Sequence, residues 1–224
     1  RFPLSPEGDS LQRPNSMKYV DKFLRCRCAP DILAVAPKMS KANKEISEAM
    51  ACQRHLKTLA LANPMGLTHV DLCSGNALLP LLTAFTLPFL DSLAVDRTPR
   101  LQSSAFTHVQ RFGYVGWDIN EVNFPLFLQN AHITNTPAVL TAVHACGNLA
   151  RRIVELYLTV DRIRHLVLMP CCCGRINLPP AIVQALGRYK AWCLELTQAA
   201  KGTVTFDCNV LSPCNGIVTA HKNP

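Results

Sequence analysis

Residues 67–77 have the sequence LTHVDLCSGNA, in which a short apolar run is followed by a turn of small residues. The run Leu67–Leu72 has the length and composition of a buried strand. Residues 77–87 continue as an apolar helix. A tight turn of small residues between a strand and a helix allows a ligand to approach the backbone closely. This stretch therefore predicts the first strand and helix of an α/β sheet, with a binding site at the turn.

The alternation of strands and helices continues from this stretch toward both ends of the chain. Before it, Ser40 is expected to cap a helix over residues 41–62, which Asn63 and Pro64 end. After it, strands are predicted over residues 92–95, 114–117, 138–143 and 165–169, with a closing pair over residues 203–206 and 217–220. Helices are predicted over residues 106–112, 122–131, 148–158 and 180–200. Strands that alternate with helices of this length indicate βαβ units and a mostly parallel sheet.

Three acidic residues lie at the ends of three successive predicted strands: Asp71, Asp96 and Asp118. In a doubly wound sheet, ligands bind beyond the carboxyl ends of the strands. A carboxylate in the position of Asp96 can accept hydrogen bonds from two ribose hydroxyls, and Asp118 followed by Ile119 can bind and cover an adenine ring. One such aspartate is most simply a loop residue, whereas the three together indicate a nucleoside-binding site.

The spacing of residues disfavours two common kinds of nucleotide-binding site. Gly75 is the only glycine in the turn, and Pro80 interrupts the spacing of the G-x-G-x-x-G fingerprint, so NAD and FAD binding are disfavoured. No Walker A pattern is present, which disfavours a P-loop nucleotidase. No apolar run reaches the ~18 residues needed to span a bilayer, so we expect no integral membrane protein.

Four short segments carry a resemblance to a known family: DLCSGN at residues 71–76, AVDR at 94–97, HACGNL at 144–149 and MPCCCG at 169–174. They resemble the S-adenosylmethionine-dependent methyltransferases that have an H-x-C-G and a P-C-C step. That family includes the methyltransferase-like 25 group and the methyltransferase domain 32 type. SPCN at residues 212–215 and KMSK at 38–41 are similar to further steps of the family, so the resemblance covers residues 38–222.

The resemblance implies an α/β, Rossmann-like class I methyltransferase fold, with a mostly parallel seven-stranded sheet whose last strand is antiparallel. It also implies S-adenosylmethionine as the cofactor, with an empty pocket as the alternative. The residues that it places on the cofactor are Asp71, Cys73, Gly75, Asp96, Asp118, Ile119 and Gly147. Two positions depart from the family pattern, since Ala77 stands where a second glycine is frequent and Asn76 where a basic residue is frequent.

Two residues after the fourth predicted strand are candidates for catalysis. His144 is the candidate general base, because histidine titrates near neutral pH. Cys146 is a candidate thiolate nucleophile for methylation of a base carbon, with Cys171 as the alternative. The simpler alternatives are a histidine bonded to the backbone and a packed, uncharged cysteine. No N/D-P-P-Y/F step follows this strand, so exocyclic-amine methylation of that kind is not indicated.

Cysteine spacing raises two metal-binding alternatives. Cys26 and Cys28 could join Cys52 and His55, which are three residues apart on one helix, in a zinc site. The C-x-C spacing is shorter than is usual for zinc. Cys146 and residues 171–173 could also hold a metal, but a packed, reduced cluster beside the cofactor pocket is the simpler interpretation. We therefore expect no metal.

The chain of 224 residues carries a formal net charge of +8, which favours an anionic partner such as RNA. Residues 1–62 hold 11 of its 23 Lys and Arg but only 6 of its 15 Asp and Glu. We expect a basic N-terminal arm over residues 1–37 and a methyltransferase-like domain over residues 38–224. The expected RNA contacts are Lys18, Lys22, Arg25, Arg27 and Arg175.

The sequence thus predicts an S-adenosylmethionine-dependent methyltransferase that acts on RNA, either rRNA or tRNA. The alternative is an inactive methyltransferase-fold scaffold or assembly factor bound to RNA or to a ribosomal particle, with protein partners reached through the arm. Eleven cysteines, three of them consecutive, indicate a reducing intracellular compartment. The first residue is Arg1 rather than Met, so we expect a processed chain, and the mitochondrial matrix, the cytoplasm and the nucleus all fit.

Overall fold

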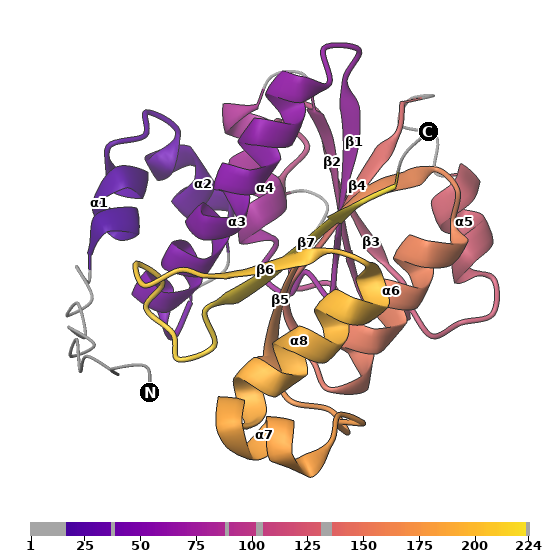
Figure 1. The fold of residues 1–224 in the computed structure, drawn as a ribbon. Helices are drawn as coiled ribbons and strands as arrows, with labels where there is room; N and C mark the ends of the chain where they lie inside the picture. The colour runs from indigo at the N-terminus through magenta and orange to yellow at the C-terminus, as the bar shows by residue number, and fades with distance from the viewer. Residues whose placement is uncertain (1–16, 37–38, 88–89, 102–104, 131–135, 223–224) are drawn as a thin grey trace.

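The computed structural model describes residues 17–36, 39–87, 90–101, 105–130 and 136–222. Its centre is a seven-stranded sheet with the strand order β3-β2-β1-β4-β5-β7-β6 (Figure 1). The strands are β1 (Leu67–Leu72), β2 (Leu90–Asp96), β3 (Phe112–Gly116), β4 (Ala138–Cys146), β5 (Ile163–Cys172), β6 (Thr203–Phe206) and β7 (Gly216–His221). The first five strands are parallel to one another, and β7 runs antiparallel to both β5 and β6. The predicted Rossmann-like fold with an antiparallel last strand is confirmed.

The strand order places the turn after β1 near the middle of the sheet. From β1 the chain adds β2 and β3 on one side, and then returns to place β4 on the other side of β1. The carboxyl ends of β1 and β4 therefore flank the point at which the strand order reverses. In open α/β sheets, ligands bind at this switch point.

Helices cover both faces of the sheet (Figure 1). The helices are α1 (Lys18–Leu24), α2 (Ala29–Val35), α3 (Ala42–Ala62), α4 (Leu78–Thr86), α5 (Phe124–Asn130), α6 (Asn148–Thr159), α7 (Pro180–Leu186) and α8 (Arg188–Ala200). Buried residues of α1 to α4 form one apolar cluster, and those of α5, α6 and α8 form the other. Successive strand residues serve opposite layers, so Val139 joins the first cluster and Leu140 the second. None of the described helices combines the length and the apolar character that a bilayer span requires.

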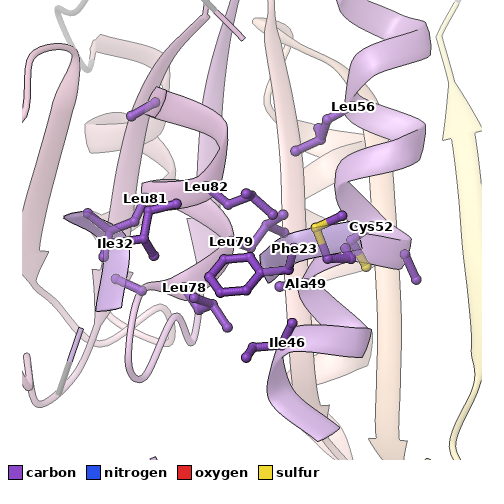
Figure 2. Close-up of a cluster of buried hydrophobic side chains, with 14 of the residues drawn as sticks. Phe23, Ile32, Ile46, Ala49, Cys52, Leu56, Leu78, Leu79, Leu81 and Leu82 are labelled. Atoms are coloured by element: carbon purple, nitrogen blue, oxygen red, sulfur yellow. The ribbon is translucent and has the colours of Figure 1, made fainter. Parts of the chain in front are cut away.

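The described part of the predicted arm packs against the rest of the chain. Phe23 on α1 and Ile32 on α2 are buried. Figure 2 shows the ring of Phe23 between the leucines of α4 and the α3 residues Ala49 and Cys52. Burial of a side chain of this size contributes about 1.5–3 kcal/mol. Residues 1–16 lie outside the described residues, and the boundary at residue 37 stays a prediction.

The long helix α3 forms for the predicted reason but does not begin as predicted. Ile46, Ala49 and Met50 recur at helical spacing and are buried. The helix ends at Asn63, whose Nδ2 donates to the carbonyl of Leu59 at 2.7 Å. At its start the N-cap residue is Lys41 with no side-chain cap hydrogen bond, so the prediction that Ser40 caps this helix is wrong.

Three other local predictions are corrected by the structure. Residues 106–111 form turns rather than a helix, because Arg111 has a φ of 61° and its guanidinium donates to the carbonyl of Leu87. The helix predicted over residues 180–200 is two helices, interrupted at Gly187, which has a φ of 75°. β4 and β5 run beyond their predicted ends at residues 143 and 169, to Cys146 and Cys172.

Candidate functional site

In the turn between β1 and α4, every second residue has a left-handed backbone conformation. Cys73, Gly75 and Ala77 have φ values of 56°, 52° and 55°. The residues between them, Ser74 and Asn76, do not have a positive φ, and this alternation makes the backbone turn tightly. The turn is tied to the next two strands, since the Gly75 N–H donates to Asp96 at 2.9 Å and the Tyr114 hydroxyl donates to the Gly75 carbonyl at 2.5 Å. The left-handed φ of Ala77 is a conformation that glycine adopts more readily than alanine.

Asp96 at the end of β2 accepts hydrogen bonds from two backbone segments, the turn after β1 and the loop after β2. Its Oδ2 accepts from the Gly75 N–H and its Oδ1 from the Thr98 N–H, each at 2.9 Å. A carboxylate offers about four lone-pair sites. Two hydrogen bonds therefore leave capacity for two further donors, as the predicted ribose contact requires.

Two adjacent cavities lie along the carboxyl ends of the first strands, with volumes of about 310 and 380 Å³. Cys73, Asp96 and Arg100 line both of them, so the two form one elongated hollow. The first cavity is bounded by α3 and by the turn; further residues in its wall are Lys41, Lys44, Glu45, Asp71, Ser74, Gly75, Asn76 and His144. The second lies beyond β2 and β3; its further residues are Arg97, Thr98, Trp117, Asp118, Ile119, Asn120 and Leu149.

The structure thus brings six of the seven predicted cofactor residues to this hollow. Gly147 lies at the same edge of the sheet, at the start of α6, but does not line either cavity. Within the second cavity, Asp118 accepts from the backbone N–H of Asn120 at 2.9 Å. Ile119 is buried next to it. Burial raises the pKa of the Cys73 thiol to about 12, so Cys73 contributes an uncharged wall.

Asp71 lines the first cavity but is almost entirely buried. Its two oxygens accept from the hydroxyls of Ser74 at 2.6 Å and Thr141 at 2.5 Å. Burial raises the pKa of Asp71 to about 6, although these two hydrogen bonds oppose the shift. Asp71 therefore holds the turn and β4 in place in addition to facing the cavity.

His144 is held by an acidic partner that the sequence analysis missed. Its Nε2 lies 2.8 Å from a carboxylate oxygen of Glu48, which is buried on α3, and the ammonium of Lys44 lies 2.9 Å from the other oxygen. Burial alone would raise the pKa of Glu48, but the hydrogen bonds and charges of His144 and Lys44 hold it below its usual range. The available signal was an acidic residue on the mostly apolar buried face of α3, between Ile46 and Ala49.

Trp117, at the end of the strand predicted over residues 114–117, lies just beyond β3 in the structure. It lines the second cavity and packs on Phe127 with ring centroids 4.6 Å apart. Its indole Nε1–H is buried and has no hydrogen-bond partner within the described part of the chain. A buried donor without a partner costs about 1–3 kcal/mol.

Cys146 lies outside both cavities, in a cluster of thiols. It is exposed at the end of β4, and its Sγ is 2.6 Å from that of Cys171 at the end of β5. Burial of part of the side chain raises the pKa of Cys146, which favours the neutral thiol over the thiolate. Its role as a nucleophile stays a prediction.

The four residues of the alternative zinc site in the N-terminal part do not form a group of metal-ligating side chains. The only group of three or more metal-ligating side chains that the described residues form is Cys146, Cys171 and Cys172. Cys26, Cys28, Cys52 and His55 are all described, so no three of them lie within 4.8 Å of one another. Cys52 is instead packed in the apolar core between α1 and α3.

The predicted RNA contacts lie in two parts of the molecule. Lys18 and Lys22 on α1, and Arg25 and Arg27 just after it, have exposed side chains. Arg175 is also exposed but follows β5, and its carbonyl accepts a hydrogen bond from Arg151. In Figure 1, α1 lies on the left flank beside α3, whereas β5 leads down toward α7.

A family model described as a methyltransferase domain matches residues 41–178. No curated protein matches the chain in sequence. The solved structures that are similar to it include the following three. TrmK of M. capricolum in complex with S-adenosyl-homocysteine has a TM-score of 0.41 and 12% identity over 70% of this chain, which spans only 63% of the TrmK chain. Magnesium protoporphyrin IX methyltransferase of Synechocystis PCC 6803 with bound S-adenosyl-homocysteine has a TM-score of 0.45 and 12% identity over 92% of this chain and 97% of that chain. The fibrillarin pre-rRNA processing protein of Methanococcus jannaschii has a TM-score of 0.44 and 10% identity over 70% of this chain and 66% of that chain.

Proposed function

Because the chain belongs to the methyltransferase-domain family whose model spans residues 41–178, we propose that it binds S-adenosylmethionine in the hollow beyond β1, β2 and β3 and methylates RNA. The observation that carries this proposal is the pair of adjoining cavities whose shared wall contains Asp96. A cofactor with a nucleoside at one end and an amino acid at the other matches an elongated hollow of two chambers. The bound cofactor would supply an activated methyl group on a sulfonium, which leaves the protein to align the acceptor.

Three features of the described residues fit that cofactor. A Cβ added to Gly75 would meet no heavy atom within 4 Å, so open space lies directly beside the turn. Asp96 keeps lone pairs for the ribose hydroxyls. In the second cavity, Trp117, Ile119 and Leu149 offer apolar walls to an adenine ring.

The first cavity would then hold the amino-acid end of the cofactor and the methyl acceptor. Its wall carries the cations Lys41, Lys44 and Arg100, which suit a carboxylate or a nucleic-acid phosphate. His144 lines the same cavity and is oriented by Glu48 at 2.8 Å, so it is our candidate to accept the proton of a hydroxyl acceptor. RNA as the acceptor is supported by the net charge of +8 and by the exposed basic residues of α1.

Calorimetry with S-adenosylmethionine and S-adenosyl-homocysteine tests the cofactor site. We expect micromolar binding to the wild type and binding weaker by about ten- to a hundredfold in Asp96→Asn, because hydrogen bonds to a charged acceptor contribute about 1.5–3 kcal/mol. The one oxygen of an asparagine can still accept from the Gly75 N–H, which keeps this tie to the turn, whereas the hydrogen bond from the Thr98 N–H is lost. Asp91→Asn is the matched control, since Asp91 lies on the same strand and lines neither cavity.

The alternative is a scaffold that keeps the fold but not the cofactor. It predicts no heat at millimolar S-adenosylmethionine and no difference between the Asp96 and Asp91 variants. That result would overturn the enzyme and leave RNA binding as the remaining activity to measure.

A further inference from the structure

Three cysteine sulfurs gather at the ends of β4 and β5. The Sγ atoms of Cys146, Cys171 and Cys172 all lie within 4.8 Å of one another. Cys146 is 2.6 Å from Cys171, and Cys171 is 3.7 Å from Cys172. Cys146 and Cys172 are exposed, so the cluster is open to solvent on one side. It lies outside both cavities of the proposed cofactor site.

The backbone at this edge departs from a regular sheet in a way that gathers the sulfurs. Successive strand residues normally point to opposite faces, so Cys171 and Cys172 would diverge in a regular β5. The pairing of β4 with β5 shifts in register between Ala145 and Cys146, which places Cys146 opposite Cys172. The Gly147 N–H then donates to the Cys172 carbonyl at 3.2 Å and continues the pairing past the shift. Such bulges redirect side chains at strand ends.

The chemistry of three thiols suits a soft metal ion. Thiolates select zinc and similar soft ions over magnesium or calcium, which prefer oxygen ligands. In a tetrahedral site with zinc–sulfur bonds of about 2.3 Å, neighbouring sulfurs are about 3.8 Å apart. The separation of Cys171 and Cys172 already matches this spacing, and the exposed Cys146 side chain has room to move outward by about 1 Å.

We propose that Cys146, Cys171 and Cys172 form a binding site for one zinc-like divalent ion, with a fourth position open to water or to an external ligand. Each thiol loses its proton on binding, so one ion replaces three protons and leaves a site of net charge −1. The ion would join the end of β4 to the end of β5, next to the first cavity.

Metal titration of the reduced full chain tests this site. The protein is stripped with a chelator, kept reduced with a phosphine, and titrated with Zn²⁺ and with Co²⁺ in the absence of S-adenosylmethionine. We expect one ion per chain, release of three protons, and a thiolate-to-cobalt absorption band in the near ultraviolet. Because no cofactor is present, this result is independent of the methyl-transfer proposal.

Two variants and a control make the assignment specific. Cys146→Ser and Cys172→Ser alter exposed side chains, so we expect them to fold and to bind the ion on the order of tenfold more weakly or worse. Cys208→Ser is the control, because Cys208 is also exposed and is not part of the group. Equal affinity in all three variants would overturn the site. So would a Cys146–Cys171 disulfide forming in air from a protein that binds no ion when reduced.

Discussion

At the scale of single residues, Asp71 links the fold to the cavity. Its Oδ1 accepts from the Thr141 hydroxyl, whose oxygen in turn lies 2.8 Å from Nε2 of His69. Because the Thr141 hydroxyl has one hydrogen and gives it to Asp71, the Nε2–H of His69 must donate to Thr141, and Nδ1 accepts from Ser92 at 3.0 Å. Burial lowers the pKa of His69 to about 3, which fits this neutral tautomer. Four buried side chains thereby connect β2, β1 and β4.

We expect Asp71→Asn to flatten the pH dependence of stability between about pH 4 and pH 6. Burial raises the pKa of Asp71 to about 6, against about 3.9 in the unfolded chain. The folded state therefore holds the proton more tightly. Stability is greatest below the unfolded pKa, and the wild type loses up to roughly 3 kcal/mol relative to the variant as the pH rises through this window. Urea unfolding of both proteins across the window measures the difference.

Asp91→Asn again serves as the control for Asp71→Asn, since Asp91 lies at the opposite end of the neighbouring strand. Parallel profiles for the wild type and Asp71→Asn would contradict the assignment of the shifted pKa to this carboxyl. A bound sulfonium would favour the charged form of Asp71, so saturating cofactor should shift the wild-type transition to lower pH.

Residue roles at the ends of strands were predictable from the sequence, whereas contacts between residues of different helices and strands were not. Asp96, Asp118 and Ile119 line the hollow because parallel strands finish at one edge, which the strand pattern already indicates. Glu48 could not be assigned to His144, since their pairing depends on how α3 crosses β4. Cys146 lies opposite Cys172 because the pairing of β4 with β5 shifts in register, and this shift could not be predicted from the sequence.

At the scale of elements, the junction between α8 and β6 is tightly constrained. Lys201 caps α8 with a φ of 52°, and the Gly202 N–H donates to the Thr197 carbonyl at 3.0 Å. A Cβ on Gly202 would lie 2.2 Å from the carbonyl oxygen of Thr219 on β7. The chain can therefore enter the β6–β7 pair only with glycine at this second position.

Neighbouring substitutions at this junction should act in opposite directions. Lys201→Gly should stabilise the protein by up to about 1 kcal/mol, because a left-handed residue with a Cβ is strained and the lysine side chain is exposed. Gly202→Ala should destabilise it by about 2 kcal/mol or more, because the clash is with backbone. Paired urea titrations measure both, and a change of the same sign in the two variants would contradict this geometry.

Element types were largely predictable from periodicity, and element ends were not. β1 has its predicted bounds because six consecutive apolar or buried positions stop at the turn. α6 starts at Asn148 as predicted and extends one residue past the predicted end, to Thr159. Gly187 interrupts the helix predicted over residues 180–200, because its φ of 75° is not helical. The sequence prediction missed this break, since the backbone angle is known only from the structure.

At the scale of the whole molecule, the proposed cofactor site and the exposed basic residues lie in different places. The proposed cofactor hollow follows the carboxyl ends of β1, β2 and β3, whereas the densest exposed basic residues lie on and after α1. α1 is nevertheless fixed to α3 through Tyr19, Val20 and Phe23. An RNA held by α1 would therefore have a defined position relative to the first cavity.

Binding of labelled RNA should weaken steeply with salt and should depend on α1. Replacing Lys18, Lys22, Arg25 and Arg27 with Gln should reduce the slope of log Kd against log salt by up to about one unit for each RNA phosphate that the variant no longer neutralises. The four side chains are exposed, so folding should be retained. The double variant Lys57→Gln and Lys201→Gln is the control, and an equal slope in both proteins would show that α1 does not hold RNA.

The strand order also has a consequence for synthesis on the ribosome. β1 ends between β2 and β4, but β4 is completed only at Cys146, about seventy residues later in the chain. Until then the nascent chain can pair β1 on one side only, and a buried, apolar strand is left as an open edge. Open edges of this kind recruit other strands. The growing chain is therefore most prone to aggregation during the interval between the emergence of β1 and the emergence of β4, when a chaperone would have the greatest effect on its yield.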